Sequence, residues 1–172
     1  MSMDTHTQTG TQTDPLIRKA PIEKIETAIV SFLKAGGLSS KYLIAAFPDN
    51  PDAFDLGKAE KAALVQYTGS RYAAPEATGA AQLRAPEFAI HLFLRSVGQP
   101  IRAPYEIEQI RMAVQDRSVQ GATLYVIKDG LVDQTGPLWR YVVEIACTPI
   151  PAAPLMRARP APFTADDQKG GA

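Results

Sequence analysis

Apolar residues recur at helical spacing near the start of the chain, at five positions in residues 22–33. Pro21 precedes them at a position that suits the first turn of a helix, where its missing N–H has no hydrogen bond to lose. Lys34, Gly36 and Gly37 follow them, which is typical of the carboxyl end of a helix. The pattern therefore predicts a helix that begins at Pro21 and ends near Lys34.

A second helical pattern begins at Pro104 and places Ile107, Ile110 and Val114 on one side, with Gly121 available as a terminator. These residues predict a second amphipathic helix. Its acidic residues are expected at solvent-facing or half-exposed positions on the helix surface, and one of them can pair with an arginine three positions on. The residues concerned are Glu106, Glu108 and Arg111.

Alternation of side chains marks the clearest strand, residues 87–95, because successive residues of a strand point to opposite faces of a sheet. Four further apolar or alternating runs predict strands at 41–47, 62–67, 122–128 and 139–148. In residues 87–95, the set expected to face the helices is Phe88, Ile90, Leu92 and Leu94, and the opposite set is Ala89, His91, Phe93 and Arg95.

The last two predicted strands are expected to pair as a hairpin, whose connection has two possible positions. Asp129 and Gly130 could form a tight turn, or the strand could continue through Val132 to a turn at residues 134–137. The longer hairpin is the preferred interpretation. On its second strand, one face carries Trp139, Tyr141, Val143, Ile145 and Cys147.

The element order is helix, strand, strand, strand, helix, strand, strand. It predicts an α+β two-layer sandwich, with two helices on one face of a largely antiparallel sheet of about five strands. Residues 21–148 are expected to form this single domain, a size that one core supports. Residues 1–20 are expected to be a flexible tail, since the first fourteen are rich in Thr and Gln. Residues 149–172 are expected to be an extended, proline-rich tail.

Composition excludes some classes of function. The chain of 172 residues is 45% hydrophobic and 21% charged, a profile typical of globular proteins. Its 18 Lys and Arg balance its 18 Asp and Glu, so no net positive field would hold nucleic acid through its phosphates. No apolar run approaches the roughly 20 residues that a membrane helix requires. A general DNA-binding function and a membrane partner are therefore not expected.

Candidate catalytic chemistry is confined to one cysteine and two histidines. Cys147 cannot form an internal disulfide, which fits a reducing cytosol, and its strand alternation places it in the core. His6 lies in the tail and His91 in a strand, so neither supplies a base for Cys147 or a metal cluster. The aspartates of residues 49–55 lack the glycine and closing Glu of a calcium loop. We therefore expect no enzyme, no cofactor and no metal site.

The unusual feature is a connection of about eighteen residues, 69–86, between two predicted strands, since hairpin loops usually take two to five residues. It contains Arg71, Tyr72 and Arg84, and arginine and tyrosine are enriched at protein interfaces. We expect this loop to contact a neighbouring subunit or partner. A passive insertion rich in small residues is the alternative.

A second candidate surface lies in residues 48–58. Its two large apolar side chains, Phe54 and Leu56, are expected to be exposed unless another element covers them. An exposed apolar patch of this kind would mark a contact site for another protein. The two segments, 69–86 and 48–58, are thus the predicted assembly surfaces.

Several weak motifs occur in a defined order: residues 46–49 with Pro51, residues 67–72, residues 88–96, residues 124–130, and then Trp139, Tyr141 and Glu144. Together they resemble the tail terminator proteins of Mu-like, contractile-tailed phages and prophages. The resemblance covers about three quarters of the chain, residues 22–148, and rests on the order and spacing of the motifs.

This resemblance implies a small α+β subunit that assembles into a ring, commonly of six copies, on the last ring of the tail tube. Such a ring stops the growth of tube and sheath and later docks the head connector. The implied partners are further copies of the chain, the tail tube protein, the tail sheath protein and head–tail connector proteins. Genomic DNA would pass through the lumen without sequence-specific binding. The implied location is the tail and neck of the virion, after assembly in the host cytoplasm.

Three alternatives remain open. A head-completion or neck adaptor protein has a similar size and also forms rings. A free-standing ligand-binding module would show a deep pocket in a stable monomer. A small cytosolic hydrolase using Cys147 is the remote alternative, because the sequence identifies no base to activate the thiol.

Overall fold

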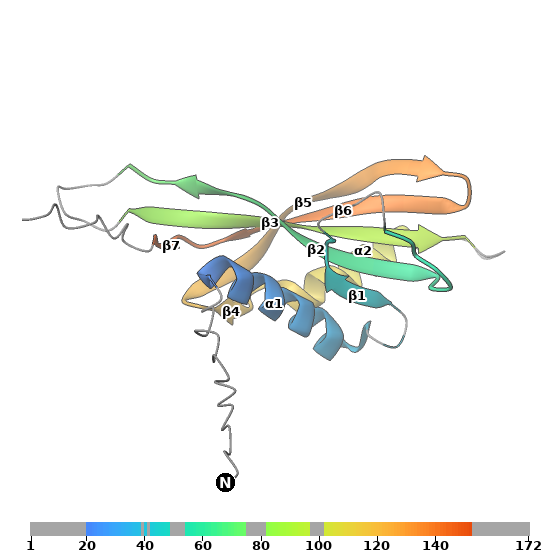
Figure 1. Ribbon diagram of the computed structural model, residues 1–172, viewed down its shortest axis with the longest axis horizontal. Coiled ribbons are helices and arrows are strands. Elements are labelled where there is room, and N and C mark those ends of the chain that lie inside the picture. Colours follow the sequence, from blue (N-terminus) through green and yellow to red (C-terminus); the bar gives the residue numbers. More distant parts are fainter. Residues whose placement is uncertain are drawn as a thin grey trace, which may run out of the picture.

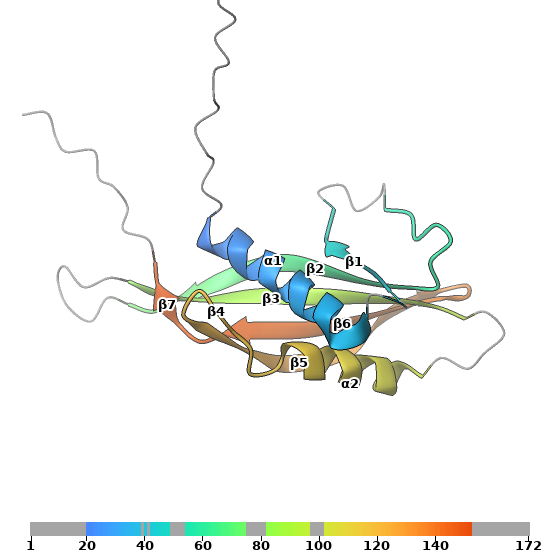
Figure 2. The ribbon, with the colours of Figure 1, turned by 90° about the horizontal axis from the view of Figure 1, so that it is seen from below.

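The computed structural model of the chain describes residues 20–38, 40, 42–48, 54–74, 82–96 and 102–152. Two helices lie on one face of a mixed, curled sheet, as the perpendicular views in Figures 1 and 2 show. No helix of the described residues covers the other face of this sheet. The predicted α+β class and the predicted order of elements are both confirmed.

Helix α1 (Pro21–Leu33) forms where the apolar spacing predicts it. The carboxylate of Glu23 accepts a hydrogen bond from the backbone N–H of Ala20 at 3.2 Å, which satisfies a donor that the helix leaves free. A π-helical turn, η1 (Lys34–Leu38), continues α1 and ends it. The residues of α1 that are fully buried are Ile25, Ile29 and Leu33.

The end of η1 requires two glycines for different reasons. Gly37 has a φ of 80°, in the left-handed region that glycine adopts without strain. A Cβ atom on Gly36 would lie 3.0 Å from the Cβ of Ala113, a residue of helix α2 (Ala103–Val114). Glycine at position 36 therefore allows the turn and α2 to approach each other closely.

The sheet contains the five expected strands and two additional strands of two residues each. The pair β1–β2 is parallel, and the other strand pairs are antiparallel. The order across the sheet is β1-β2-β3-β6-β5-β4, and β7 pairs with β3. The strands are β1 (Leu43–Ala46), β2 (Lys61–Tyr72), β3 (Leu83–Arg95), β4 (Ser118–Val119), β5 (Ala122–Thr135), β6 (Leu138–Cys147) and β7 (Ile150–Pro151).

The β5–β6 hairpin takes the longer of the two predicted forms. Pairing continues from Leu124 opposite Cys147 to Thr135 opposite Leu138, and the turn follows Thr135. Gly136 in this turn has a φ of 56°, which favours glycine. Two bulges interrupt the register of β5, one between Val126 and Lys128 and one between Leu131 and Asp133.

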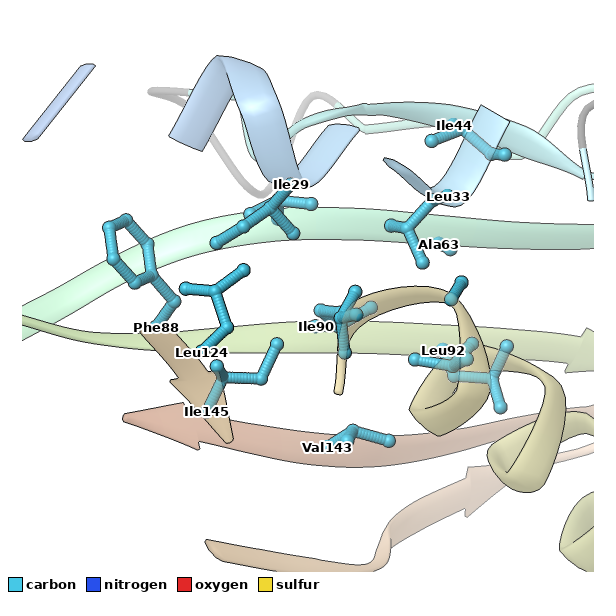
Figure 3. Close-up of a cluster of buried hydrophobic side chains, with 14 of the residues drawn as sticks. Ile29, Leu33, Ile44, Ala63, Phe88, Ile90, Leu92, Leu124, Val143 and Ile145 are labelled. Atoms are coloured by element: carbon cyan, nitrogen blue, oxygen red, sulfur yellow. The ribbon is translucent and has the colours of Figure 1, made fainter. Parts of the chain in front are cut away.

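The hydrophobic core lies between the helices and the sheet. Along β3 the alternation is as predicted, and the four side chains that face the helices are at most 2% exposed. Figure 3 shows Ile29 and Leu33 of α1 together with side chains from β1, β2, β3, β5 and β6 in this core. Each fully buried aliphatic side chain stabilises the fold by about 1.5–3 kcal/mol relative to exposure. The strand residues of the core include Ile44, Ala63, Val65, Phe88, Ile90, Leu92, Leu94, Leu124, Val143, Ile145 and Cys147.

The two ends of the segment 69–86 are strand, which corrects the expectation that the whole segment is a loop. Strand β2 continues through Tyr72 and β3 begins at Leu83, so residues 69–72 and 83–86 are strand and only residues 73–82 connect them. Of the remaining connection, residues 75–81 lie outside the described residues. The small residues and prolines of this segment hide the alternation by which strands are predicted, and pairing with the partner strand decides its conformation.

The sheet also continues past Thr148, where the expected domain ended. Ile150 is buried, and it pairs with Arg84 while Pro151 pairs with Leu83. The backbone N–H of Ala152 then donates a hydrogen bond to the carbonyl of Gln82 at 2.7 Å. The chain after β6 therefore follows the edge of β3 instead of leaving the sheet at residue 149.

Candidate functional site

The most distinctive surface is a two-stranded extension, here termed the β2–β3 arm, made of residues 69–74 and 82–86. It begins at a bulge between Tyr67 and Gly69, where the register of β2 against β3 shifts. Past this bulge, the strands extend beyond the end of α1, with β7 beside them (Figure 1). The arm consequently has far less cover than the central part of the same two strands.

Three predicted interface residues, Arg71, Tyr72 and Arg84, lie together on the arm. Arg71 faces away from the helices and forms an ion pair with Glu87 of β3. Tyr72 is 55% exposed and pairs directly with Arg84 across the two strands. The Nε atom of Arg84 is buried and has no acceptor among the described residues. The arm thus combines a planar cation with an exposed aromatic ring.

A shallow hollow of about 290 Å³ lies on this arm. Apolar atoms dominate its lining, and Leu83 at its edge is exposed. Its position at the end of the sheet, open to solvent, suits contact with a side chain of another protein better than enclosure of a small ligand. The lining residues are Arg71, Tyr72, Ala73, Leu83, Ala85 and Pro149.

The second predicted surface is corrected by the structure. Leu56 is 6% exposed, and the ring of Phe54 packs on that of Phe93 with centroids 5.4 Å apart. Arg95 fastens the same segment to β3, since its guanidinium donates a hydrogen bond to the carbonyl of Gly57 at 3.0 Å. Phe54 and Leu56 therefore cover part of the sheet instead of forming an exposed patch. Residues 49–53 of the predicted surface lie outside the described residues.

The face of the sheet opposite the helices forms a surface that the sequence analysis did not single out. At its centre, His91 stacks against Phe47 with ring centroids 4.7 Å apart, and its Nε2 is 2.8 Å from the Oε1 of Gln66. Burial and the charge of Arg140 lower the pKa of His91 below its ordinary value. The imidazole is therefore held neutral in a half-buried aromatic setting. The alternation of β3 had already grouped His91 with Phe93 on this face.

Charged side chains of both signs surround this centre. Arg140 of β6 pairs with Asp133 of β5 at 2.6 Å, and Lys128 lies 3.7 Å from Glu144. These ion pairs join the adjacent strands β5 and β6 and are partly exposed to solvent. Each therefore contributes little to the stability of the fold by itself. Their mixed signs suit contact with a protein surface better than contact with a polyanion.

One charged residue is buried, and it corrects the expectation of a solvent-facing helix surface. Glu106 of α2 is 8% exposed; it accepts a hydrogen bond from the Tyr42 hydroxyl and forms an ion pair with Lys61 at 2.5 Å. Burial, and then the hydrogen bond to Glu106, raise the pKa of Tyr42. This cluster joins α2 to β2 and to the segment before β1, so its role is structural. By contrast, the predicted pair of Glu108 and Arg111 is present on the surface.

Cys147 lacks the protonation state of a nucleophile and, among the described residues, a histidine on its own face of the sheet. It is fully buried, and burial raises the pKa of its thiol to about 12. His91 lies on the opposite face of the sheet, because its strand partner Val142 faces away from Val143 and Cys147. Within the described part of the chain, no three His, Cys, Asp or Glu residues are grouped as metal ligands. None of the described helices has the length and apolar character to span a membrane.

These features define a small α+β protein whose prominent surfaces are suited to contacts with other proteins. The chain belongs to the Gp37 protein family, since the model of that family matches residues 38–163. This is a family of phage structural proteins, described as a tail component of Mu-like phages. The match begins after α1 and extends eleven residues beyond Ala152. A comparison with curated proteins finds no match.

Proposed function

We propose that the protein is a tail terminator. In this proposal, copies of the chain form a ring of six on the end of the tail tube, stop the growth of tube and sheath, and provide the docking surface for the head connector. The observation that carries the proposal is the β2–β3 arm, a two-stranded extension with exposed side chains on a member of a phage protein family. The ring would lie in the neck region of the virion.

The arm supports assembly because two strands by themselves gain little stability in water. Its exposed Tyr72 and Leu83 gain cover only when another surface packs against them. A contact between the arm of one copy and a different surface of the next is heterologous, and such contacts close into rings when the rotation allows it. The balanced charge of the chain suits a ring through which DNA passes without being held.

The oligomeric state is the first test. Sedimentation velocity on the full chain should give the mass of about six subunits, and electron microscopy should show a ring. A stable monomer at micromolar concentration would contradict the proposal. In a phage that lacks the gene, tails of uncontrolled length should appear, and the full chain supplied in trans should restore the normal length. Tails of normal length that fail to join heads would instead indicate a neck adaptor.

The role of the arm can be tested with matched aromatic substitutions. Tyr72→Ala removes an arm side chain that is 55% exposed, and Tyr105→Ala removes a side chain on α2 that is 54% exposed. Equal exposure makes the two changes comparable in the isolated subunit. We expect Tyr72→Ala to raise the concentration at which the ring dissociates by about tenfold or more. Tyr105→Ala should leave it unchanged, and equal effects of both would show that the arm is not the interface.

A charge reversal provides a second matched pair. Arg71→Glu breaks an exposed ion pair on the arm, and Arg111→Glu breaks an exposed ion pair on α2. Reversal of a charge at an interface adds repulsion to the loss of attraction. Only Arg71→Glu is expected to weaken the ring, with both variants folded by circular dichroism. Rings of undiminished stability would make the arm a passive feature.

A further inference from the structure

Residues 127–133 of strand β5, here termed the β5 edge, have no partner strand among the described residues on the side away from β6. On the side away from β6, β4 pairs only with Ala122 and Thr123, and the Gln115 side chain accepts a hydrogen bond from the N–H of Val126. Beyond these contacts, no described strand pairs with this side of β5. The β5 edge therefore presents backbone groups that can accept another strand. It also exposes Ile127, Leu131 and Val132.

The carboxyl-terminal segment leaves the described fold at the opposite end of the sheet. Strand β7 runs along β3 to the arm, and Ala152 is the last described residue. The family match continues through residue 163, so the pattern of the family includes the eleven residues that follow Ala152. Residues 153–163 are thus a candidate for binding outside their own subunit.

We propose that residues 155–159 of one subunit add as an antiparallel strand to the β5 edge of a neighbouring copy. The proposal rests on the proposed ring, because the acceptor is a second copy of this chain. Extended segments commonly bind in this way, with backbone hydrogen bonds for affinity and alternate side chains for specificity. Pro154 and Pro160 bracket the segment, and since proline cannot donate a ladder hydrogen bond, they limit the strand to five residues.

One antiparallel register matches the side chains of the two strands. It sets Leu155 opposite Leu131 and Arg157 opposite Asp129, which pairs aliphatic with aliphatic and positive with negative on one face. On the other face, Met156 lies opposite Gly130, where no atom lies within 4 Å of an added Cβ. In this register the segment matches the β5 edge in one aliphatic pair and one pair of opposite charges, and Met156 meets an open position at Gly130.

The acceptor must belong to a neighbour because the chain is too short to reach its own β5 edge. Leu131 pairs with Tyr141, which is opposite Leu92 of β3, whereas Pro151 is opposite Leu83. Nine residues of β3 separate these positions, a distance of roughly 30 Å. Three residues from Ala152 to position 155 span at most about 10 Å. Each copy would then donate one segment and accept one, a heterologous arrangement that can close a ring.

Cysteine trapping tests the contact directly. One population of the full chain carries Leu131→Cys and a second carries Leu155→Cys, while the native Cys147 is buried and does not compete. After co-expression and mild oxidation, the proposal expects disulfide-linked dimers that contain one chain of each kind. Leu43→Cys, exposed on the opposite edge of the sheet, is the matched control and should not pair with Leu155→Cys. Pairing with position 43 instead would overturn the proposal.

A single chain that carries both Leu131→Cys and Leu155→Cys distinguishes exchange from an internal contact. Exchange predicts a ladder of linked subunits on a denaturing gel. An internally linked chain that migrates as a monomer would overturn the geometry given above.

Charge reversal gives a readout that does not depend on cysteines. Asp129→Arg and Arg157→Asp should each raise the dissociation concentration of the ring by about tenfold, and the double variant should recover most of the loss. If the wild-type chain forms a ring and the Asp129→Arg variant forms a ring of equal stability, the exchange is overturned while the ring itself stands. A wild-type chain that stays monomeric would overturn both the ring and the exchange, so the two failures are distinguishable.

Discussion

The two faces of β3 differ although they belong to one strand. From Phe88 to Leu94, the face toward the helices carries only aliphatic and aromatic side chains, which are almost completely buried. The opposite face carries His91 and Arg95 among apolar neighbours, and it is covered only in part, by Phe47 and by the segment around Phe54. One face is thus closed by the subunit itself, and the other keeps room for contacts with other proteins.

Because the two faces differ in this way, substitutions on them should affect two different properties, the stability of the subunit and its association with other copies. A substitution on the helix side should act on the free energy of unfolding, because every neighbour there is part of the same packed core. A substitution on the open side or on the β2–β3 arm should act mainly on association, since few intramolecular contacts are lost. Substitutions on the helix side should therefore lower stability more than substitutions on the open side.

The largest effect is expected for Leu92→Asp. Leu92 is fully buried between the sheet and the helices, and a carboxylate there would have no partner and no water. We expect a loss of at least about 4 kcal/mol in the free energy of unfolding, a large fraction of the roughly 5–15 kcal/mol that is typical of a domain. Circular dichroism during urea unfolding measures the effect. A folded variant with an unchanged urea midpoint would show that Leu92 does not face the core.

A smaller but still large effect is expected for Glu106→Ala. The change leaves the Tyr42 hydroxyl and the Lys61 ammonium without their shared partner. Removal of one member of a buried, charged cluster should cost about 2–4 kcal/mol. The matched control is Glu108→Ala, two residues away on the exposed side of α2, which should leave the urea midpoint unchanged. Equal midpoints for both variants would contradict the structural role of Glu106.

Cys147→Ser is expected to have a moderate effect. It places a hydroxyl in a fully buried, apolar site and should cost roughly 1–3 kcal/mol. Ring formation should persist in the folded variant, because the thiol takes no part in assembly. Thermal unfolding and sedimentation velocity measure the two properties separately. A stable, ring-forming variant that fails to complement the phage would assign a chemical role to Cys147.

The smallest effect on stability is expected for His91→Gln, within roughly 1 kcal/mol at neutral pH, because the amide keeps a polar contact with Gln66. The pH dependence is more informative. The folded state holds the pKa of His91 below 6.5, so unfolding takes up a proton as the pH falls below that value. Wild-type stability should therefore decline below pH 6.5 more steeply than that of His91→Gln. If the stability of both proteins declined equally with falling pH, the fold would not lower the pKa of His91.

Local pattern predicted the helices, the inward face of β3, the buried position of Cys147 and the longer hairpin, and each is confirmed. These features depend on residues a few positions apart, which share a face by the geometry of the helix or the strand itself. The pair of Glu108 and Arg111 was predictable for the same reason. The match to the Gp37 family likewise supports a phage structural protein, while the terminator role remains the proposal made above.

The order of elements and the side chains of the core could therefore be predicted from the amino-acid sequence, because periodicity and apolar character act locally. The burial of Glu106 could not, because its partners lie 45 and 64 residues away along the chain and are brought to it by the fold. The cover over Leu56 and the strand conformation of Arg71, Tyr72 and Arg84 have the same origin. In each case the outcome depends on which distant segment packs alongside, and no local pattern carries that information.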